Sequence, residues 1–251
     1  MKWFSLISTF LLALCLCHIA TAVPVDDPDM YWKMFNVYSL GNIGVSSSYY
    51  TSDFQGVAGA AGSAWFENFE LNLLNQGGPY SLYVQNNAAI RHGTYHGGIL
   101  SGGDTTLDYF TVFGDVVGGG AVTIGGWNDP DSPLAPGGTV IGSVLAGNGG
   151  ALSNYTITQE LHNDGSMTAA DGTVEGGVHN AGTLEMTRSA VTGEMENSGT
   201  AGFTHGTVTG DITNTGALEL SNMTGNQDLY NSGSVVLTDG TISGTAYNGG
   251  S

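Results

Sequence analysis

The sequence is poor in basic residues. Four lysines and arginines stand against 22 aspartates and glutamates, which gives a formal net charge of −18. Such a surface repels phosphate backbones and anionic lipid headgroups, so the composition disfavours nucleic acids and membrane surfaces as partners. It remains compatible with calcium, with a cationic partner or with solvent.

Cysteine is also scarce. The two cysteines, Cys15 and Cys17, lie in an N-terminal segment with the features of a secretion signal. This segment has a lysine at its second residue, an apolar run over residues 4–16 and an Ala-Thr-Ala cleavage pattern at residues 20–22. The run is too short to span a bilayer. We therefore predict a signal peptide over residues 1–22, a secreted or cell-surface protein, no membrane insertion, and no disulfides in the mature chain.

The remaining sequence contains a regular repeat. From Asn163 onward, every seventeenth residue is an asparagine without a slip: Asn163, Asn180, Asn197, Asn214, Asn231 and Asn248. A glycine follows each of them by two residues, and an apolar residue precedes each by two. Three columns that match over six consecutive repeats indicate a stacked repeat architecture.

The repeat predicts a solenoid. Short strands of alternating residues, separated by Gly and Asn turns, would pair in parallel with the next coil about 4.8 Å away. The predicted fold is all-β, a single-stranded right-handed parallel β-helix of about ten coils. Val116 and Val144 are farther apart than one repeat, and the turn-rich excess between them predicts a surface loop over residues 126–138. We expect a cap with the first strands over residues 23–72 and the solenoid over residues 73–251.

Each repeat asparagine is expected to form one step of a ladder. Equal positions of parallel coils lie above one another, so a side-chain amide can bond the next coil and cap the local turn. The alternative is a row of asparagines that faces a ligand.

Threonines gather at the corner before each of these asparagines. They form a partial T-x-T array: Thr156, Thr158, Thr173, Thr192, Thr207, Thr209, Thr224 and Thr241. Parallel coils place such hydroxyl and methyl groups on a regular grid, which is the geometry that repetitive ice-binding proteins use. The array is a candidate surface-binding face. The alternative is ordinary packing, since threonine is a favoured strand residue.

Acidic residues also form a column. Glu194, Asp211 and Asp228 occupy one position in three successive coils. Like charges on adjacent strands repel, so these three residues are candidate Ca²⁺ ligands. The alternative is a solvated acidic face that blunts lateral strand pairing. No other cofactor is expected.

Histidines offer a candidate zinc site. His92 and His96 share one strand-like segment, whereas His162 and His179 are neighbours in adjacent coils. Zinc binding is one interpretation of such pairs. Stacking on the surface is the other.

Signals for catalysis are sparse. A nucleophile elbow, a P-loop and an H-E-x-x-H motif are all absent from the sequence. The coils from residue 163 onward contain a single lysine or arginine, Arg188. We therefore expect that the chain is not an enzyme. Asn154 and Asn222 begin sequons, which makes them candidate glycosylation sites if the source is eukaryotic.

The N-terminal part resembles a known extracellular domain. Residues 35–44 read Phe-Asn-Val-Tyr-Ser-Leu-Gly-Asn-Ile-Gly, and residues 53–62 read Asp-Phe-Gln-Gly-Val-Ala-Gly-Ala-Ala-Gly. With the later Gly-Asp segments at Asp104 and Asp115, they resemble the choice-of-anchor A domain over roughly residues 30–160. The resemblance implies an adhesive extracellular domain of surface proteins that carry varied C-terminal anchors.

These features lead to one main hypothesis. We expect a secreted structural or adhesive solenoid that binds an extracellular surface, a polysaccharide or a matrix protein through repeated flat faces. The alternatives are an ice-binding protein that uses the threonine array and, third, a carbohydrate-active enzyme. The last coil stops within a repeat, at residues 248–251. The sequence therefore also predicts an open strand edge, which either associates head to tail or frays.

Overall fold

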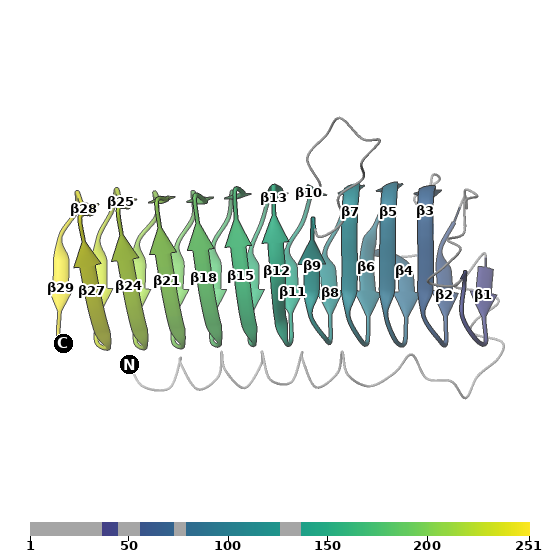
Figure 1. Cartoon of the computed structure of the whole chain (residues 1–251), viewed down its shortest axis with the longest axis horizontal. Coiled ribbons are helices and arrows are strands. Elements are labelled where there is room, and N and C mark those ends of the chain that lie inside the picture. The colour runs from purple at the N-terminus through teal and green to yellow at the C-terminus, as the bar shows by residue number, and fades with distance from the viewer. Residues whose placement is uncertain (1–36, 45–55, 73–78, 126–136) are drawn as a thin grey trace.

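The protein is a long rod of stacked β-coils (Figure 1). The computed structural model describes residues 37–44, 56–72, 79–125 and 137–251, and within them the chain forms about 11 turns of roughly 17 residues, with strands and no helix. The predicted all-β solenoid is confirmed. The predicted signal peptide at residues 1–22, residues 23–36 and 45–55 of the predicted cap, residues 73–78 of the predicted solenoid and residues 126–136 of the predicted loop lie outside the described residues.

One strand of every coil belongs to a parallel sheet that we call the first sheet. Within the described residues it holds 12 strands, each paired with the equivalent strand of the next coil. In stacking order they are β1 (Val37–Ser39), β2 (Ala58–Ala60), β4 (Tyr80–Val84), β6 (Gly98–Ser101), β8 (Val116–Gly118), β11 (Val144–Ala146), β14 (Leu161–Asn163), β17 (Val178–Asn180), β20 (Met195–Asn197), β23 (Ile212–Asn214), β26 (Leu229–Asn231) and β29 (Ala246–Asn248).

The other strands form the second sheet, which holds 17 strands within the same described ranges. The first coils contribute one long strand each, namely β3 (Ala64–Leu71), β5 (Ala88–Tyr95) and β7 (Thr105–Val112). Later coils contribute two short strands each, which are β9 (Val122–Ile124), β10 (Gly138–Val140), β12 (Gly149–Ser153), β13 (Tyr155–Ile157), β15 (Ser166–Ala170), β16 (Thr173–Val174), β18 (Thr183–Thr187), β19 (Ala190–Val191), β21 (Thr200–Thr204), β22 (Thr207–Val208), β24 (Ala217–Ser221), β25 (Thr224–Gly225), β27 (Ser234–Thr238) and β28 (Thr241–Ile242). Strand β7 pairs with both β9 and β10, so the long strands of the first coils continue directly into the pairs of short strands of the later coils.

The register confirms the constant repeat in the C-terminal half. Leu161 pairs with Val178, and the same step along the sequence continues from coil to coil as far as β29. Val116 pairs directly with Val144. The long interval between these two valines is therefore one enlarged coil, as the sequence predicts.

The first coils are enlarged in a way that the sequence does not reveal. Val37 pairs with Ala58, and Ala58 pairs with Leu82, so both of these coils are longer than the constant step of the C-terminal half. Both pairings nevertheless run in register over three residues. The described part of residues 37–72 thus forms the first rungs of the same stack.

Alternate residues of each strand face inward. In β14 and β20 of the first sheet, the first and third residues are buried and the middle residue is not. In the second sheet, Leu184 and Met186 of β18 are buried and Glu185 between them is exposed. The two-residue period of a strand, repeated once per coil, therefore builds a continuous core.

Large core side chains are accommodated by glycines in the following coil. A Cβ atom at Gly138 would lie 2.3 Å from the ring of Phe110, and one at Gly172 would lie 2.3 Å from the ring of Tyr155. Each ring thus occupies space that belongs to two coils. These glycines are required for packing, since any side chain there would overlap the ring.

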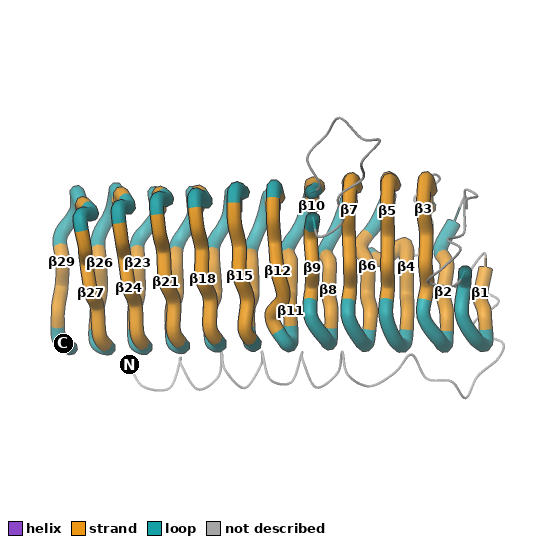
Figure 2. Tube along the Cα trace, viewed as in Figure 1, coloured by secondary structure: helices purple, strands orange, loops and turns teal. Residues whose placement is uncertain are grey.

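One corner of the coil is set by residues with left-handed backbone conformation. Nine residues of the described chain form this corner column, with φ between 48° and 58°: Asn68, His92, Tyr109, Asn154, Asp171, Arg188, His205, Asn222 and Asp239. Asparagine and aspartate tolerate this conformation better than most residues, and they supply five of the nine positions. Figure 2 shows the corners of successive coils aligned along the rod.

Candidate functional site

The repeat asparagines form a buried ladder at the end of the first-sheet strands. The side-chain amide of Asn163 donates to Oδ1 of Asn180 at 2.8 Å, and the same bond joins every later pair at 2.6–2.7 Å. The members from Asn163 to Asn231 are at most 5% exposed. Their amides hold neighbouring coils together and do not face a ligand.

The predicted threonines separate into two columns beside the corner column. We call the one nearer the corner the threonine column, and its paired members are Thr156, Thr173, Ala190, Thr207, Thr224 and Thr241. This column continues toward the N-terminus through Thr139, Thr111 and Thr94. Sequence reasoning missed Thr94 and Thr111 because the enlarged coil between Val116 and Val144 interrupts the period, and it missed Thr139 although this residue stands one regular step before Thr156.

The other column contains Thr158, Thr192 and Thr209. The hydroxyl of Thr209 donates to the backbone carbonyl of Thr192 at 2.8 Å, and the hydroxyl of Thr192 donates to the carbonyl of Glu175. The hydroxyl groups of Thr192 and Thr209 therefore bond the preceding coil. They are not presented to a partner.

The corner column and the threonine column line a shallow groove along the rod. Two depressions, of about 740 and 870 Å³, meet at Asn154. The first extends from Asn68 to Asn154, and the second extends from Asn154 to Asn222. Small residues contribute to the lining in several coils: Gly93, Gly138, Gly172, Ser189 and Gly206.

The side chains of the groove differ between its two parts. In the first part the rings of His92 and Tyr109 stack with centroids 4.6 Å apart and an interplanar angle of 3°. In the second part Arg188 donates two hydrogen bonds of 2.6 Å to the carboxylate of Asp171. The hydrogen bonds from the guanidinium lower the pKa of Asp171. The groove thus presents aromatic rings, hydroxyls and an internally neutralised ion pair.

Two members of the acidic column accept hydrogen bonds from backbone amides. Oδ1 of Asp211 accepts the N–H of Asp228 at 3.1 Å, and Oδ1 of Asp228 accepts the N–H of Thr245 at 2.7 Å. Charge-assisted bonds of this kind stabilise a carboxylate. For Asp211 and Asp228, such bonds offset part of the repulsion between like charges, and Ca²⁺ binding by the column stays a prediction. Glu194, the third candidate calcium ligand, lies one coil before Asp211.

The N-terminal histidine pair does not gather around a common point. His92 stacks on Tyr109, whereas His96 stacks on Phe113 with ring centroids 5.4 Å apart. Each histidine therefore pairs with an aromatic ring of the following coil.

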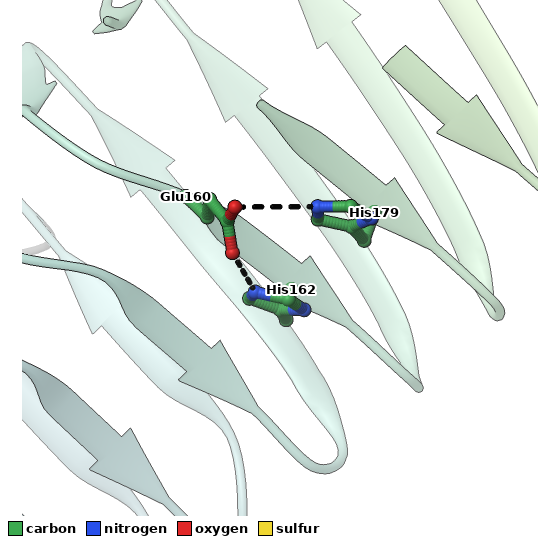
Figure 3. Close-up of side chains that lie close together, drawn as sticks. All are labelled: Glu160, His162 and His179. Carbon is green, nitrogen blue, oxygen red and sulfur yellow. Dashed lines mark hydrogen bonds and ion pairs between the residues drawn. The ribbon is translucent and has the colours of Figure 1, made fainter. Parts of the chain in front are cut away.

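The second histidine pair gathers with a glutamate on the outer face of the first sheet (Figure 3). Nε2 of His162 lies 2.8 Å from Oε2 of Glu160, and Nε2 of His179 lies 3.8 Å from Oε1 of the same residue. Within the described ranges these three form the group of metal-ligating side chains whose ligand atoms all lie within 4.8 Å of one another. The hydrogen bond from His162 lowers the pKa of Glu160. Sequence reasoning missed Glu160, whose signal is its position two residues before His162.

The two sequon asparagines lie on the groove. Asn154 and Asn222 are both exposed members of the corner column. A glycan on either side chain would stand beside the threonine column, where it would compete with any partner in the groove.

Comparisons with protein-family models, with curated proteins and with solved structures returned no match in any of the three. None of the described segments is a helix of the length and hydropathy that a membrane span needs. The resemblance to the choice-of-anchor A domain stays a prediction from the residues that carry it.

Proposed function

We propose that the protein is a secreted structural or adhesive module that binds an extended polysaccharide or matrix polymer along the groove. The observation that carries this proposal is the continuity of the groove, whose two parts share Asn154 and follow successive coils. Each coil offers equivalent side chains about 4.8 Å after the last. A polymer of repeating units can engage many such positions at once, so weak single contacts add up.

The charge of the chain favours a partner without negative charge. The formal net charge is −18, which repels an anionic polymer at low salt. Within the groove Arg188 is bound to Asp171, so this arginine does not offer a free cation. We therefore propose a neutral polysaccharide as the partner.

Binding is proposed to occur without cleavage. Glycosidases that use two carboxylates hold them about 5–10 Å apart. The carboxylates among the described residues that line the groove are Glu70 and Asp171. They lie five coils apart in the pairing from Glu70 to Thr173, which is about 24 Å at the usual strand spacing.

A matched pair of substitutions tests the groove. Thr207 and Thr213 are both exposed, outward-facing strand residues, but Thr207 lies in the groove and Thr213 lies in the first sheet. We expect Thr207→Tyr to weaken binding to a neutral polysaccharide by about tenfold, because the ring fills the shallow groove. Thr213→Tyr should leave binding unchanged. Affinity electrophoresis in gels that contain neutral, cationic or anionic polysaccharides measures both.

Two results would contradict this proposal. Equal retardation of both variants and the parent chain would move the binding surface away from the groove. Release of shortened glycans from the same panel would show cleavage, and would replace the adhesive function with the carbohydrate-active enzyme.

Ice binding is the second candidate function, and the extended threonine column favours it. Eight of nine successive coils carry threonine in this column, the exception being Ala190. Thermal hysteresis of the parent chain that Thr207→Tyr abolishes and Thr213→Tyr preserves would support it. The hydroxyls of Thr192 and Thr209 donate to backbone carbonyls, so only the threonine column is left to contact ice. For this reason ice binding is the second candidate.

End-to-end self-association stays a prediction. Val236 and Leu237 of β27 are 56% and 45% exposed, and Leu237 stands in register with Leu220 of the buried core. Light scattering on a concentration series tests this association. A constant monomer mass at the highest concentration would remove it.

A further inference from the structure

The Glu160, His162 and His179 cluster has an arrangement that the backbone enforces. Glu160 and His162 are two residues apart beside and within β14, so their side chains emerge on the same face. His179 is the direct partner of His162 in β17, and the two rings stack with centroids 4.6 Å apart and an interplanar angle of 11°. One strand thus supplies two groups and the next strand supplies the third.

A glycine leaves space beside this cluster. In the coil of His179, the position equivalent to Glu160 is Gly177, since Leu161 pairs with Val178. A Cβ atom at Gly177 would lie 3.6 Å from Nε2 of His179. The absence of a side chain lets the carboxylate of Glu160 lean toward His179, and it leaves room for a small ion between them.

A second carboxylate sets the orientation of His179. Nδ1 of His179 lies 3.0 Å from Oε2 of Glu196, its neighbour in β20. When Nδ1 donates to a carboxylate, Nε2 becomes the free ligand atom, which is the usual outer-shell arrangement of metal-binding histidines. In this structure Nε2 is the atom that faces Glu160.

We propose that Glu160, His162 and His179 bind a divalent transition-metal ion of the Zn²⁺ or Cu²⁺ type. Two imidazole nitrogens and one carboxylate oxygen are a ligand set that these ions accept, with water in the open position. Ca²⁺ prefers a shell made of oxygen atoms, so it fits this cluster poorly. The acidic surface of the chain raises the local concentration of any cation.

Binding requires two adjustments. Nε2 of His162, which donates its proton to Glu160 in this structure, must give that proton up to solvent or carry it on Nδ1 instead, so that its lone pair is free for the ion. The lone pair of each Nε2 lies in the ring plane, and the two rings are nearly parallel, so at least one ring must turn to direct both nitrogens at one ion. The side chains of His162 and His179 are 21% and 33% exposed, which leaves them room to turn. The bound ion would then join two adjacent coils of the first sheet and stabilise the folded chain by mass action.

Isothermal titration of the full chain with ZnCl₂, CuCl₂ and CaCl₂ tests this site. We expect one equivalent of Zn²⁺ or Cu²⁺ to bind and to raise the unfolding temperature, and CaCl₂ to do neither. The paired substitution His162→Gln with His179→Gln should weaken binding by at least about tenfold, and Glu160→Gln should also weaken it. Gly177→Val keeps every ligand but fills the adjacent space, and should weaken binding as well.

The control substitution is His205→Asn, because His205 lies in the corner column and asparagine tolerates its left-handed backbone. This variant should bind the ion as the parent chain does. Circular dichroism of each variant checks that the fold is kept. The proposal is overturned if neither Zn²⁺ nor Cu²⁺ binds, or if the double histidine variant and the parent chain bind the ion equally. Neither result would bear on the proposed polysaccharide binding, because the groove proposed for the polysaccharide lies along the second sheet and the histidine cluster lies on the first.

Discussion

The two halves of the rod hold their coils in register by different side chains. In the N-terminal half, Oδ1 of Asn87 accepts the N–H of Asp104, and Oδ1 of Asp104 accepts the N–H of Ala121, both at 2.9 Å and both exposed. In the C-terminal half the buried ladder from Asn163 to Asn231 performs this role. Both devices join a side chain of one coil to a polar group of the next.

The ladder stops because its column changes composition. The positions in register with Asn163 are Ala146, Gly118, Ser101 and Val84 in the preceding coils. Alanine, glycine and valine side chains cannot donate along the stack, so the link moves a few residues onward to the turn. The polar link between coils thus changes both its position and its residue type along the stack.

The cores of the two halves also differ. The long strands of the N-terminal half pack aromatic side chains, and the rings of Phe66 and Phe69 lie 4.5 Å apart. The C-terminal strand β18 packs Leu184 and Met186 instead. The N-terminal half contains longer coils after Val37, Ala58 and Val116, but the coils joined by Asn87 and Asp104 keep the same step of 17 residues as the laddered coils. A constant coil length therefore does not require the buried ladder.

The largest expected effect comes from breaking the ladder. Asn197→Ala removes the oxygen that accepts a hydrogen bond from Asn180. It also removes the amide that donates to Oδ1 of Asn214 and to the backbone carbonyl of Ala217. Because these groups are buried, we expect a loss of about 3 kcal/mol of unfolding free energy. Urea unfolding followed by circular dichroism measures it, and amide hydrogen exchange shows whether the C-terminal coils open first.

The matched substitution in the other half is Asp104→Ala. Its amide partner is exposed and can bond water, so we expect a loss of about 1 kcal/mol. Equal losses for the two variants would contradict the distinction between a buried and an exposed link.

A smaller loss is expected from filling the space beside an aromatic ring. Gly172→Val places a side chain where the ring of Tyr155 now lies, and such overpacking costs about 1–3 kcal/mol. Thr173→Val, one residue onward in the outward threonine column, is the control and should change stability little. In a double-mutant cycle with Tyr155→Ala, the two losses should not add, because removing the ring relieves the overlap. Additive losses would show that the ring and the glycine do not share this space.

Much of the C-terminal half could be predicted from sequence. A constant step along the chain identifies which side chains stack, so Asn180 must lie beside Asn197 and His162 beside His179. The same spacing could not reveal the corner column. Its members share a backbone conformation but not a residue type, as Arg188 and His205 show.

The candidate sites were harder to predict for two physical reasons. An insertion between strands hides the period between Thr111 and Thr139, so Thr94 and Thr111 were not recognised as members of the threonine column. Contacts between residues of different columns depend on side-chain orientation, which the spacing of the repeat does not determine. Glu160 reaches His179 because Gly177 has no side chain to fill the space between them, and the spacing of the repeat does not indicate this contact.

Alkaline pH should affect the buried tyrosines. Burial raises the pKa of Tyr155 from 10.0 to about 12. The unfolded chain therefore loses this proton first, so the stability that Tyr155 contributes is complete below pH 10 and is lost as pH rises toward 12. At pH 11 the loss is about 1.4 kcal/mol. Urea unfolding of the parent chain and of Tyr155→Phe between pH 9 and about 11 measures it, and parallel pH profiles of the two chains would contradict it.

The smallest expected effect distinguishes the two halves by its sign. The hydroxyl of Tyr95, in the N-terminal half, is buried and has no hydrogen-bond partner among the described residues, and burial raises its pKa well above the ordinary value. Tyr95→Phe keeps the ring and removes the unsatisfied hydroxyl, so we expect a gain of about 1 kcal/mol in unfolding free energy. The hydroxyl of Tyr155 donates to Oγ of Ser189 at 3.3 Å, so Tyr155→Phe should lose about 0.5–1 kcal/mol at neutral pH. Urea unfolding at pH 7 compares the two, and a loss for Tyr95→Phe would mean that its hydroxyl is satisfied in solution.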